Sequence, residues 1–580
     1  MNRKVMIRIV ILLAGAGIAF ISLFAYRLGL DNDPGWGGGR LRILVLGLLI
    51  ILFGSAYWIM PAMQRIPFIA KWSVLFEADG LDEIPLSSKA RSSFMDILLA
   101  LAGIMAIWVY IWVISVGGFD KFPSGRDYYG LLARAFQMGQ THLLVEPGSD
   151  LLNLENPYDY KQRKDLDYLW DVTLYNGKYY LYWGPIPAVL GSIFSSATSI
   201  PVTDAGLVFT FVAGSALFSI LLLRAIKREY AYPDWLYGGA ALVLLVNIPL
   251  IWMLTRPKFY EVSAAGGMFF MMAGFYFLFL AFRSAPLSNF LLALAALSFG
   301  LAVGSRINLA PAIFFLGLFM LWRVYSLRGE RLSDSLPAFL SVVIPLLVVA
   351  VSLAWYNYIR FGSILEFGHH YQLTGASVTP VFNDTMSLNY VLPNLYNYFL
   401  RLPGISMQFP FVTLGWIRED MWPSFIQPPA GYYYTDPVGG FPFIVPLIGL
   451  VILLGLRSLW RSINGDVEIR ASDSAGWLAF ALLGYCLIQT IVLLMYITSN
   501  MRYLVDIAQE TILLSVIFAG SYMRTFAINR FQKKVVGIIW ILASALTVIM
   551  GLLIGITGDK NNFLNQNPQV YYQLLEWFSR

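Results

Sequence analysis

The sequence contains little of what metal centres and disulfides require. Among its 580 residues there are one cysteine, Cys486, and three histidines. These numbers exclude an internal disulfide, a cysteine metal site and a histidine-rich metal centre. Charged residues make up only 13% of the chain, and the net charge of +6 comes from cations in short loops rather than from a nucleic-acid-binding surface. The glycine-rich stretch at 35–39 lacks the lysine and hydroxyl residue of a phosphate-binding loop, and no organic cofactor is expected.

Apolar residues, in contrast, are abundant and form runs of membrane-spanning length. They account for 58% of the chain, and the runs are long and do not alternate with polar residues, which is typical of transmembrane helices. Thirteen runs fall near 6–26, 41–60, 94–116, 203–224, 236–255, 262–283, 288–303, 307–323, 337–357, 438–456, 476–498, 504–523 and 535–556. The sequence therefore predicts an all-α polytopic membrane protein with about 13 transmembrane helices, the first of them retained rather than cleaved.

The distribution of lysine and arginine predicts which side each loop faces. Groups of three or four cations precede the first run and follow the second, fourth, eighth, tenth and twelfth, which places these loops and the N-terminus in the cytoplasm. Three cations, Arg27, Arg40 and Arg42, do not fit, so the span count in the first 60 residues stays open. The apolar stretch 185–200 would reverse every later loop if it crossed the membrane. It is short for a span, so we expect an interfacial helix on the external side.

Two long polar segments, 118–202 and 358–437, are then expected on the external side. The part from Gly118 to Gly184 holds nine carboxylates, seven lysines or arginines and fourteen aromatic residues. Disordered chain is poor in aromatic residues, so this composition predicts a folded surface on the membrane. Chemistry is expected there, because long connections of this kind are uncommon unless they are functional.

Asp127 is the leading candidate for that chemistry. Tyr128, Leu131 and the apolar residues that follow repeat at helical spacing, so a helix is expected to begin beside Asp127. One interpretation is that Asp127 only caps this helix, together with Ser124. The other is that a carboxylate at the positive end of a helix takes a proton from a bound hydroxyl. Asp120 is the neighbouring alternative.

A metal site in the same segment is open. Glu146, Asp159 and Asp171 are further carboxylates, and one of them beside Asp127 would suit a divalent cation, which prefers oxygen ligands. No spacing among them is diagnostic, so each is equally interpreted as a solvated loop residue. The adjacent His369 and His370 point apart on any regular element, which argues against joint metal ligation.

Cations at the external ends of spans form a second group of candidates. They are Lys178, Arg256, Lys258, Arg306 and Arg502. Each alone is consistent with a side chain that extends to the membrane surface. Together they indicate a bound phosphate, because the positive-inside bias depletes cations from this side and arginine in particular suits phosphate.

The first external segment resembles that of the type C glycosyltransferase superfamily, which includes protein O-mannosyltransferases and lipid A aminoarabinose transferases. The sequence Arg-Asp-Tyr-Tyr-Gly-Leu-Leu-Ala-Arg-Ala-Phe at 126–136 is similar to the opening of the family's first loop, with Asp127 at the catalytic aspartate's place. Gly177-Lys178-Tyr179-Tyr180, with Pro185 and Pro187, is similar to the segment that closes the loop. Tyr128 stands where the family has a second acidic residue, which leaves metal dependence open. The pattern also looks like uncharacterised bacterial members.

The resemblance implies an integral-membrane glycosyltransferase on the external side of a bacterial inner membrane. It would move a sugar, with inversion, from a polyprenyl-phosphate-linked donor to a glycan, lipid or protein acceptor. Asp127 would act as the base. The lipid phosphate would be bound by Arg256, Arg306, Lys178 and Arg502, and the sugar or acceptor would contact Tyr129, Tyr180, Trp183 and His369.

The same resemblance suggests a division of the chain. Residues 1–93 form two N-terminal spans and a cytoplasmic loop, 94–357 the catalytic membrane module, 358–437 the second external loop, and 438–580 the C-terminal spans and an external tail. Three alternatives to this glycosyltransferase stay open. A transporter or flippase would need ionisable residues at mid-membrane and an internal repeat, whereas charges lie mainly at span ends. A surface-polysaccharide ligase or polymerase would use the later loop, and an inert scaffold would tolerate loss of Asp127.

Overall fold

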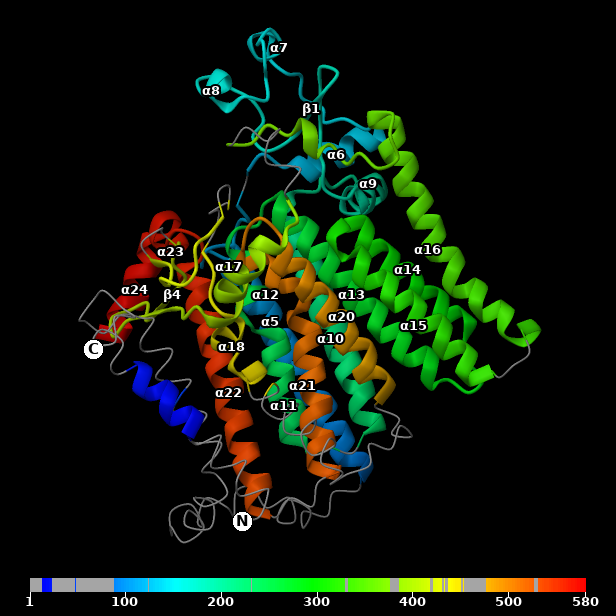
Figure 1. Ribbon diagram of the computed structural model, residues 1–580, viewed down its shortest axis with the longest axis vertical. Helices are drawn as coiled ribbons and strands as arrows, with labels where there is room; N and C mark the ends of the chain where they lie inside the picture. The colour runs from blue at the N-terminus through cyan, green and yellow to red at the C-terminus, as the bar shows by residue number, and fades with distance from the viewer. Residues whose placement is uncertain are drawn as a thin grey trace.

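The computed structural model describes residues 13–22, 47, 88–123, 125–230, 232–328, 332–375, 385–417, 421–429, 432, 437–449, 452, 476–525 and 530–579. This part is a bundle of long apolar helices with a layer of loops and short elements above one end (Figure 1). The predicted run near 41–60 apart from residue 47, about half of the run near 6–26 and the end of the run near 438–456 lie outside the described residues.

Within the described part, nine helical segments are long and apolar enough to cross a membrane. They are Asp96–Ile114, Asp204–Glu229, Asp234–Thr255, Phe259–Arg283, Ile307–Leu327, Ser335–Phe361, Gly476–Met495, Met501–Met523 and Phe531–Gln566. The described part is therefore mostly helical with nine candidate membrane spans, whereas the total of about 13 spans stays a prediction.

The corresponding helices, together with the shorter apolar helix α14, form the bundle in Figure 1. They are α5 (Ser88–Ile114), α10 (Asp204–Glu229), α11 (Asp234–Leu245), α12 (Ile248–Thr255), α13 (Phe259–Arg283), α14 (Asn289–Ser305), α15 (Ala310–Arg328), α16 (Leu332–Phe361), α20 (Gly476–Met495), α21 (Val505–Thr525) and α22 (Arg530–Thr557). The predicted single run at 236–255 is divided, because Asn247 caps α12 through the main-chain N–H of Leu250 and Pro249 follows directly.

The first of the two long polar segments, which keeps the name first external segment from the side that the charge pattern predicts, folds over one end of this bundle. It contains α6 (Tyr128–Gln137), α7 (Ser149–Leu152), α8 (Tyr160–Arg163), strands β1 (Thr173–Tyr175) and β2 (Lys178–Tyr180), and α9 (Ile186–Thr198). The strands pair antiparallel, with Thr173 opposite Tyr180, around an Asn176-Gly177 turn in which both residues have positive φ. The apolar stretch predicted at 185–200 is the 13-residue α9, which packs on α6 and is too short to cross a bilayer.

The second external segment is tied to the first by main-chain hydrogen bonds. Its elements are η3 (His369–Tyr371), η5 (Leu388–Tyr390), α17 (Val391–Leu395), η6 (Tyr396–Leu400), β3 (Gly404–Ile405) and β4 (Val412–Thr413), followed by α18 (Phe441–Ile444). The Leu373 N–H donates to Val172 at 2.8 Å, and the Asp171 N–H donates to Leu373 at 2.8 Å. The two segments that the charge pattern assigned to one compartment thus form one body. Near the C-terminus, α23 (Asn562–Gln566) and α24 (Pro568–Ser579) follow α22.

Candidate functional site

A cavity of about 720 Å³ lies where the two external segments meet the ends of the spans. Its lining includes residues 170–171 and 182–184 from the first segment, and His369 and Gln372 from the second. The remaining walls come from α13, the start of α15, the end of α20 and η8 (Met501–Leu504). We call it the arginine cavity, because Arg256, Arg306 and Arg502 all line it.

Each of these arginines is held by a carboxylate. The Arg306 Nε atom lies 2.8 Å from Asp506 Oδ1, Arg256 Nη1 lies 3.4 Å from Asp559, and Arg502 Nη1 lies 3.6 Å from Glu261. The guanidinium of Arg502 also stacks 4.4 Å from the ring centre of Tyr260. None of the three carboxylates belongs to the cavity lining, so they orient the cations from behind. A guanidinium has five N–H donors, which allows it to bind an anion while keeping such a partner.

Asp171 is the one carboxylate among the residues that line the arginine cavity. The side chains of Tyr260 and Gln372 both donate hydrogen bonds to it, and only 7% of the residue is exposed. Its φ of +61° places it in the left-handed region, a strained conformation that clusters at functional sites. Burial raises the pKa of Asp171, while the bonds from Tyr260 and Gln372 and the charge of Arg502 oppose the rise. Asp171 is therefore suited to accept a proton.

Aromatic rings and a neutral histidine complete the wall. The ring of Trp183 meets those of Phe259 and Tyr260 edge-on, with centroids 4.9 Å apart in both pairs. His369 packs 4.5 Å from the ring of Tyr182. Desolvation by these neighbours lowers the pKa of His369 to about 4, so its imidazole is neutral at physiological pH.

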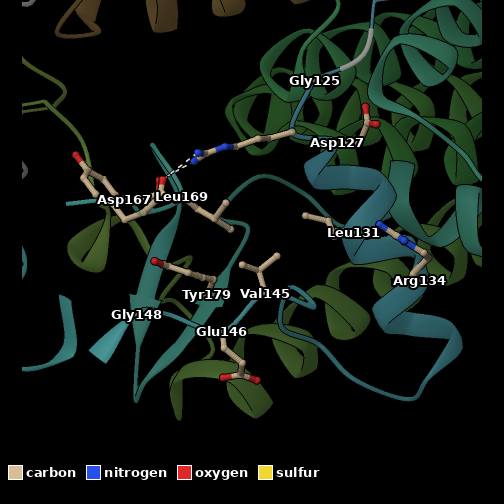
Figure 2. A pocket seen from close by; sticks show the side chains of 12 residues that line it. Gly125, Asp127, Leu131, Arg134, Val145, Glu146, Gly148, Asp167, Leu169 and Tyr179 are labelled. Atoms are coloured by element: carbon tan, nitrogen blue, oxygen red, sulfur yellow. Dashed lines mark hydrogen bonds and ion pairs between the residues drawn. The ribbon is translucent and has the colours of Figure 1, made fainter. Parts of the chain in front are cut away.

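A second pocket of about 450 Å³ lies beside the first segment's hairpin (Figure 2). We call it the Asp127 pocket. Its lining comprises Gly125, Arg126, Asp127, Leu131, Arg134, Val145, Glu146, Gly148, Asp167, Tyr168, Leu169 and Tyr179. Figure 2 shows Leu131, Val145 and Leu169 pointing toward one another, with the charged side chains around them.

Asp127 makes no capping hydrogen bond to its own helix, although it occupies the N-cap position of α6. Its Oδ1 instead accepts the main-chain N–H of Asp204 at 3.0 Å. The buried Asp204 carboxylate caps α6 in its place, accepting the N–H groups of Tyr128 at 3.1 Å and Tyr129 at 2.9 Å. Burial raises the pKa of Asp127, against the Asp204 N–H and the charge of Arg134. The predicted cap therefore exists, but another residue provides it.

The structure brings together five of the predicted site residues. Arg256, Arg306, Arg502, Trp183 and His369 all line the arginine cavity. The remaining predicted residues lie elsewhere. Asp127 lines the other pocket, and Lys178 is exposed at the start of β2 and lines neither. Tyr129 and Tyr180 are buried; the Tyr129 hydroxyl donates to the Gly184 carbonyl at 3.1 Å.

Sequence reasoning did not single out Asp204, Tyr260 or Gln372, and it named Asp171 only as one of three possible metal ligands. Asp204 carries a local signal, since Thr203-Asp204 directly precedes an apolar run, as helix-start residues do. Nothing local distinguishes Asp171 from the other carboxylates of the segment. Among the described residues, no group of three or more His, Cys, Asp or Glu side chains is placed to hold a metal ion.

No family model and no curated protein matches the chain. Several solved structures are similar. The apo form of the Archaeoglobus fulgidus oligosaccharyltransferase is 14% identical, with a TM-score of 0.43, over 83% of this chain and 60% of that one. The oligosaccharyltransferase AglB of A. fulgidus, with an inhibitory peptide and a dolichol-phosphate, is 14% identical over 84% and 60%, with a TM-score of 0.41. ArnT from Cupriavidus metallidurans, bound to undecaprenyl phosphate, is 12% identical over 79% and 75%, with a TM-score of 0.41.

The chain spans about 60% of the length of the two oligosaccharyltransferase chains. All three identities are 14% or lower and all three TM-scores lie below 0.5, so the function proposed below rests on this chain's own residues. An oligosaccharyltransferase and ArnT are thus among the solved structures to which the chain is similar.

Proposed function

We propose that the protein is an integral-membrane glycosyltransferase that moves a sugar from a polyprenyl-phosphate-linked donor to an acceptor hydroxyl. One observation carries the proposal. Three arginines from separate parts of the chain line one cavity together with a buried carboxylate and a tryptophan. This combination provides a cation set for a phosphate, a proton acceptor and an aromatic face for a sugar.

The lipid phosphate would lie against Arg256, Arg306 and Arg502. The cavity lining carries these three guanidiniums against the single carboxylate of Asp171, so it favours an anion. The carboxylates behind the arginines fix their positions before the substrate binds, and such preorganised charges stabilise a leaving group as its bond breaks. The apolar part of the lining, which includes Ile307, Ala310, Pro311 and Leu493, suits the first units of a prenyl chain.

Asp171 would accept the proton of the acceptor hydroxyl. The hydroxyl oxygen then forms a bond to the anomeric carbon of the sugar, and the bond from that carbon to the phosphate oxygen breaks. Its electron pair leaves with the lipid phosphate, which the arginines hold, and a single displacement of this kind inverts the anomeric carbon. Asp171 takes the role that the sequence suggested for Asp127, because Asp171 shares a cavity with the arginines. Asp127 as the base stays a prediction and is tested beside it.

The site would face the exterior of a bacterial inner membrane, with the N-terminus in the cytoplasm. The support is the distribution of lysine and arginine in the sequence, together with the pairing of the two segments expected on the external side. The acceptor class, whether glycan, lipid or protein, is left to the experiment.

The test is transfer of labelled sugar from the cell's polyprenyl-phosphate-sugar pool into envelope fractions. Asp171→Asn and Arg306→Gln should abolish transfer at matched membrane expression. Asp150→Asn, an exposed position in the same segment, is the matched control and should transfer normally. Equal transfer by wild type and Asp171→Asn would overturn the assignment of Asp171. Loss of transfer in Asp127→Asn alone would return the base to Asp127.

One observation favours a transporter as the second candidate. Asp506 and Glu510 are buried in the span Met501–Met523, and ionisable residues within spans often mark transport pathways. If the protein is a flippase, the transfer of labelled sugar into envelope fractions should be the same for wild type and for the site variants. On deletion of the protein, lipid-linked sugar would instead accumulate on one leaflet of the membrane.

A further inference from the structure

The arginine cavity and the Asp127 pocket share a wall. In the segment 167–171, Asp167, Tyr168 and Leu169 line the Asp127 pocket, whereas the next two residues line the arginine cavity. The same holds for β2 and the residues after it, where Tyr179 lines the Asp127 pocket and residues 182–184 line the arginine cavity. The two chambers therefore lie back to back across a few residues.

Aromatic rings run along this wall from one chamber to the other. Tyr168 lines the Asp127 pocket and Trp170 lines the arginine cavity, and their ring centroids lie 6.2 Å apart. Trp170 is 42% exposed. The Tyr128 hydroxyl donates to the Trp170 carbonyl at 3.0 Å, which fixes the main chain of this wall to α6. An extended ligand could rest on these rings while it occupies both chambers.

The Asp127 pocket has the composition of a site for a polyhydroxylated ring. Leu131, Val145 and Leu169 point toward one another and form an apolar floor (Figure 2). Tyr168 and Tyr179, which also line the pocket, add aromatic surface. Guanidinium and carboxylate groups surround this floor. The C–H face of a sugar suits such a floor, while planar charged groups bind its hydroxyls. The volume of about 450 Å³ lies within the ordinary range of small-molecule pockets.

The charges that line the Asp127 pocket indicate which net charge its ligand can carry. Its lining carries three carboxylates, Asp127, Glu146 and Asp167, against two guanidiniums. Arg126 is already engaged by Asp167 at 3.1 Å and by the Tyr168 carbonyl at 2.7 Å. The lining of the arginine cavity has the opposite balance, with three guanidiniums against one carboxylate. A phosphate or carboxylate ligand is thus favoured in the arginine cavity and disfavoured in the Asp127 pocket.

We propose that the Asp127 pocket binds a neutral or amino-substituted saccharide, as the subsite for the acceptor glycan of the transfer reaction. This inference rests on the proposed function for its role but not for its binding chemistry. The glycan would place its remote rings on the floor of the pocket. Its reacting end would pass over Tyr168 and Trp170 toward Asp171.

The test is calorimetric titration of the full-length protein in lipid nanodiscs with three soluble probes. These are tetra-N-acetylchitotetraose, which is neutral, the glucosamine tetramer, which is cationic, and tetragalacturonate, which is anionic. The first two should bind and the third should bind at least about tenfold more weakly. Binding led by tetragalacturonate, or binding of none of the three, would overturn the inference.

Variants locate the binding. Leu131→Arg fills the floor with a charged side chain, and Tyr168→Ala removes aromatic surface without adding bulk. Each should weaken binding of the neutral probe by about tenfold or more. Leu152→Arg adds the same charge at an exposed position of the same segment, outside both chambers, and should bind as wild type does. Unchanged binding in both pocket variants would refute the location.

A parallel titration with undecaprenyl phosphate separates this inference from the proposed function. Arg306→Gln should lose the lipid phosphate and keep the saccharide, and Leu131→Arg should do the reverse. If wild type binds the saccharide but not the lipid phosphate, the donor proposal fails and the pocket assignment stands. Retained lipid binding in Leu131→Arg also shows that this variant is folded.

Discussion

Asp127 and Asp204 cap each other's helices. The Asp127 carboxylate accepts the N–H of Asp204 at the start of α10, and the Asp204 carboxylate accepts the N–H groups of Tyr128 and Tyr129 at the start of α6. The first external segment is thereby fixed to the membrane bundle at one point. Both tyrosines also contact the lining of the arginine cavity. The Tyr128 hydroxyl donates to the Trp170 carbonyl, and the Tyr129 hydroxyl donates to the Gly184 carbonyl.

Loss of Asp204 should therefore destabilise the protein. Asp204→Ala leaves two buried N–H groups without an acceptor, and each such group costs about 1–3 kcal/mol. We expect a lower midpoint in thermal unfolding of the purified protein in detergent. Asp150→Ala, at an exposed site of the same segment, is the control and should melt as wild type does. An unchanged midpoint for Asp204→Ala would show that this cap carries no stability.

Variants of the buried pair Arg306 and Asp506 should distinguish the contribution of Arg306 to stability from its contribution to lipid binding. Arg306→Gln leaves Asp506 buried without its cation, and breaking a buried pair in this way costs about 3–5 kcal/mol. The double variant Arg306→Gln/Asp506→Asn removes both charges and should recover much of that stability. Its affinity for undecaprenyl phosphate should nevertheless be lower than that of wild type by about tenfold or more, because a charged donor is missing. Full recovery of lipid binding would show that Arg306 only neutralises Asp506.

The pH dependence of transfer should report the environment of Asp171. Its pKa is raised above the ordinary value of 3.8 by burial, and a base works only when deprotonated. The kcat/KM value should therefore fall as the pH decreases through a pKa that is higher than that of a free aspartate.

Two variants extend this pH experiment. Tyr260→Phe and Gln372→Leu each remove a donor that stabilises the carboxylate, so both should move the acidic limb to still higher pH. A shift to lower pH would contradict the sign of the argument. An acidic limb that moves with neither variant would mean that Asp171 is not the titrating base.

The close approach of Gly184 to α14 should not tolerate a side chain. A Cβ atom at this position would overlap the carbonyl of Gly304 on α14, the helix whose C-cap residue is Arg306. We expect Gly184→Ala to lower the free energy of unfolding by about 1–3 kcal/mol, as overpacking does. We also expect it to lower transfer, because pushing Gly184 away from α14 would displace the neighbouring Trp183 and Arg306. Thermal unfolding and labelled-sugar transfer would measure both effects. Gly103→Ala on α5 is the control, because a Cβ there meets nothing within 4 Å and the position lines neither chamber.

The sequence predicted the local features of this fold well. Apolar runs located the spans that the structure describes, because lipid requires long helices with satisfied backbone groups. Helical spacing located α6, and the length of 185–200 indicated a helix too short for the bilayer, which is α9. Division of the span 236–255 was missed, because its cause is a side-chain cap at Asn247 within an otherwise apolar run.

For the site, the sequence by itself determined which cations are unusual, and only the tertiary structure decided which of them act together. Arg256, Arg306 and Arg502 stand out against the positive-inside pattern, but Lys178 does so equally and lies outside the cavity. Asp127 has a local motif, whereas Asp171 gains its burial, its two donors and its cationic neighbours from segments far away in the chain. Hydropathy and helical spacing are properties of neighbours in sequence. Desolvation and convergence of charges depend on distant segments that pack together, and no local pattern encodes them.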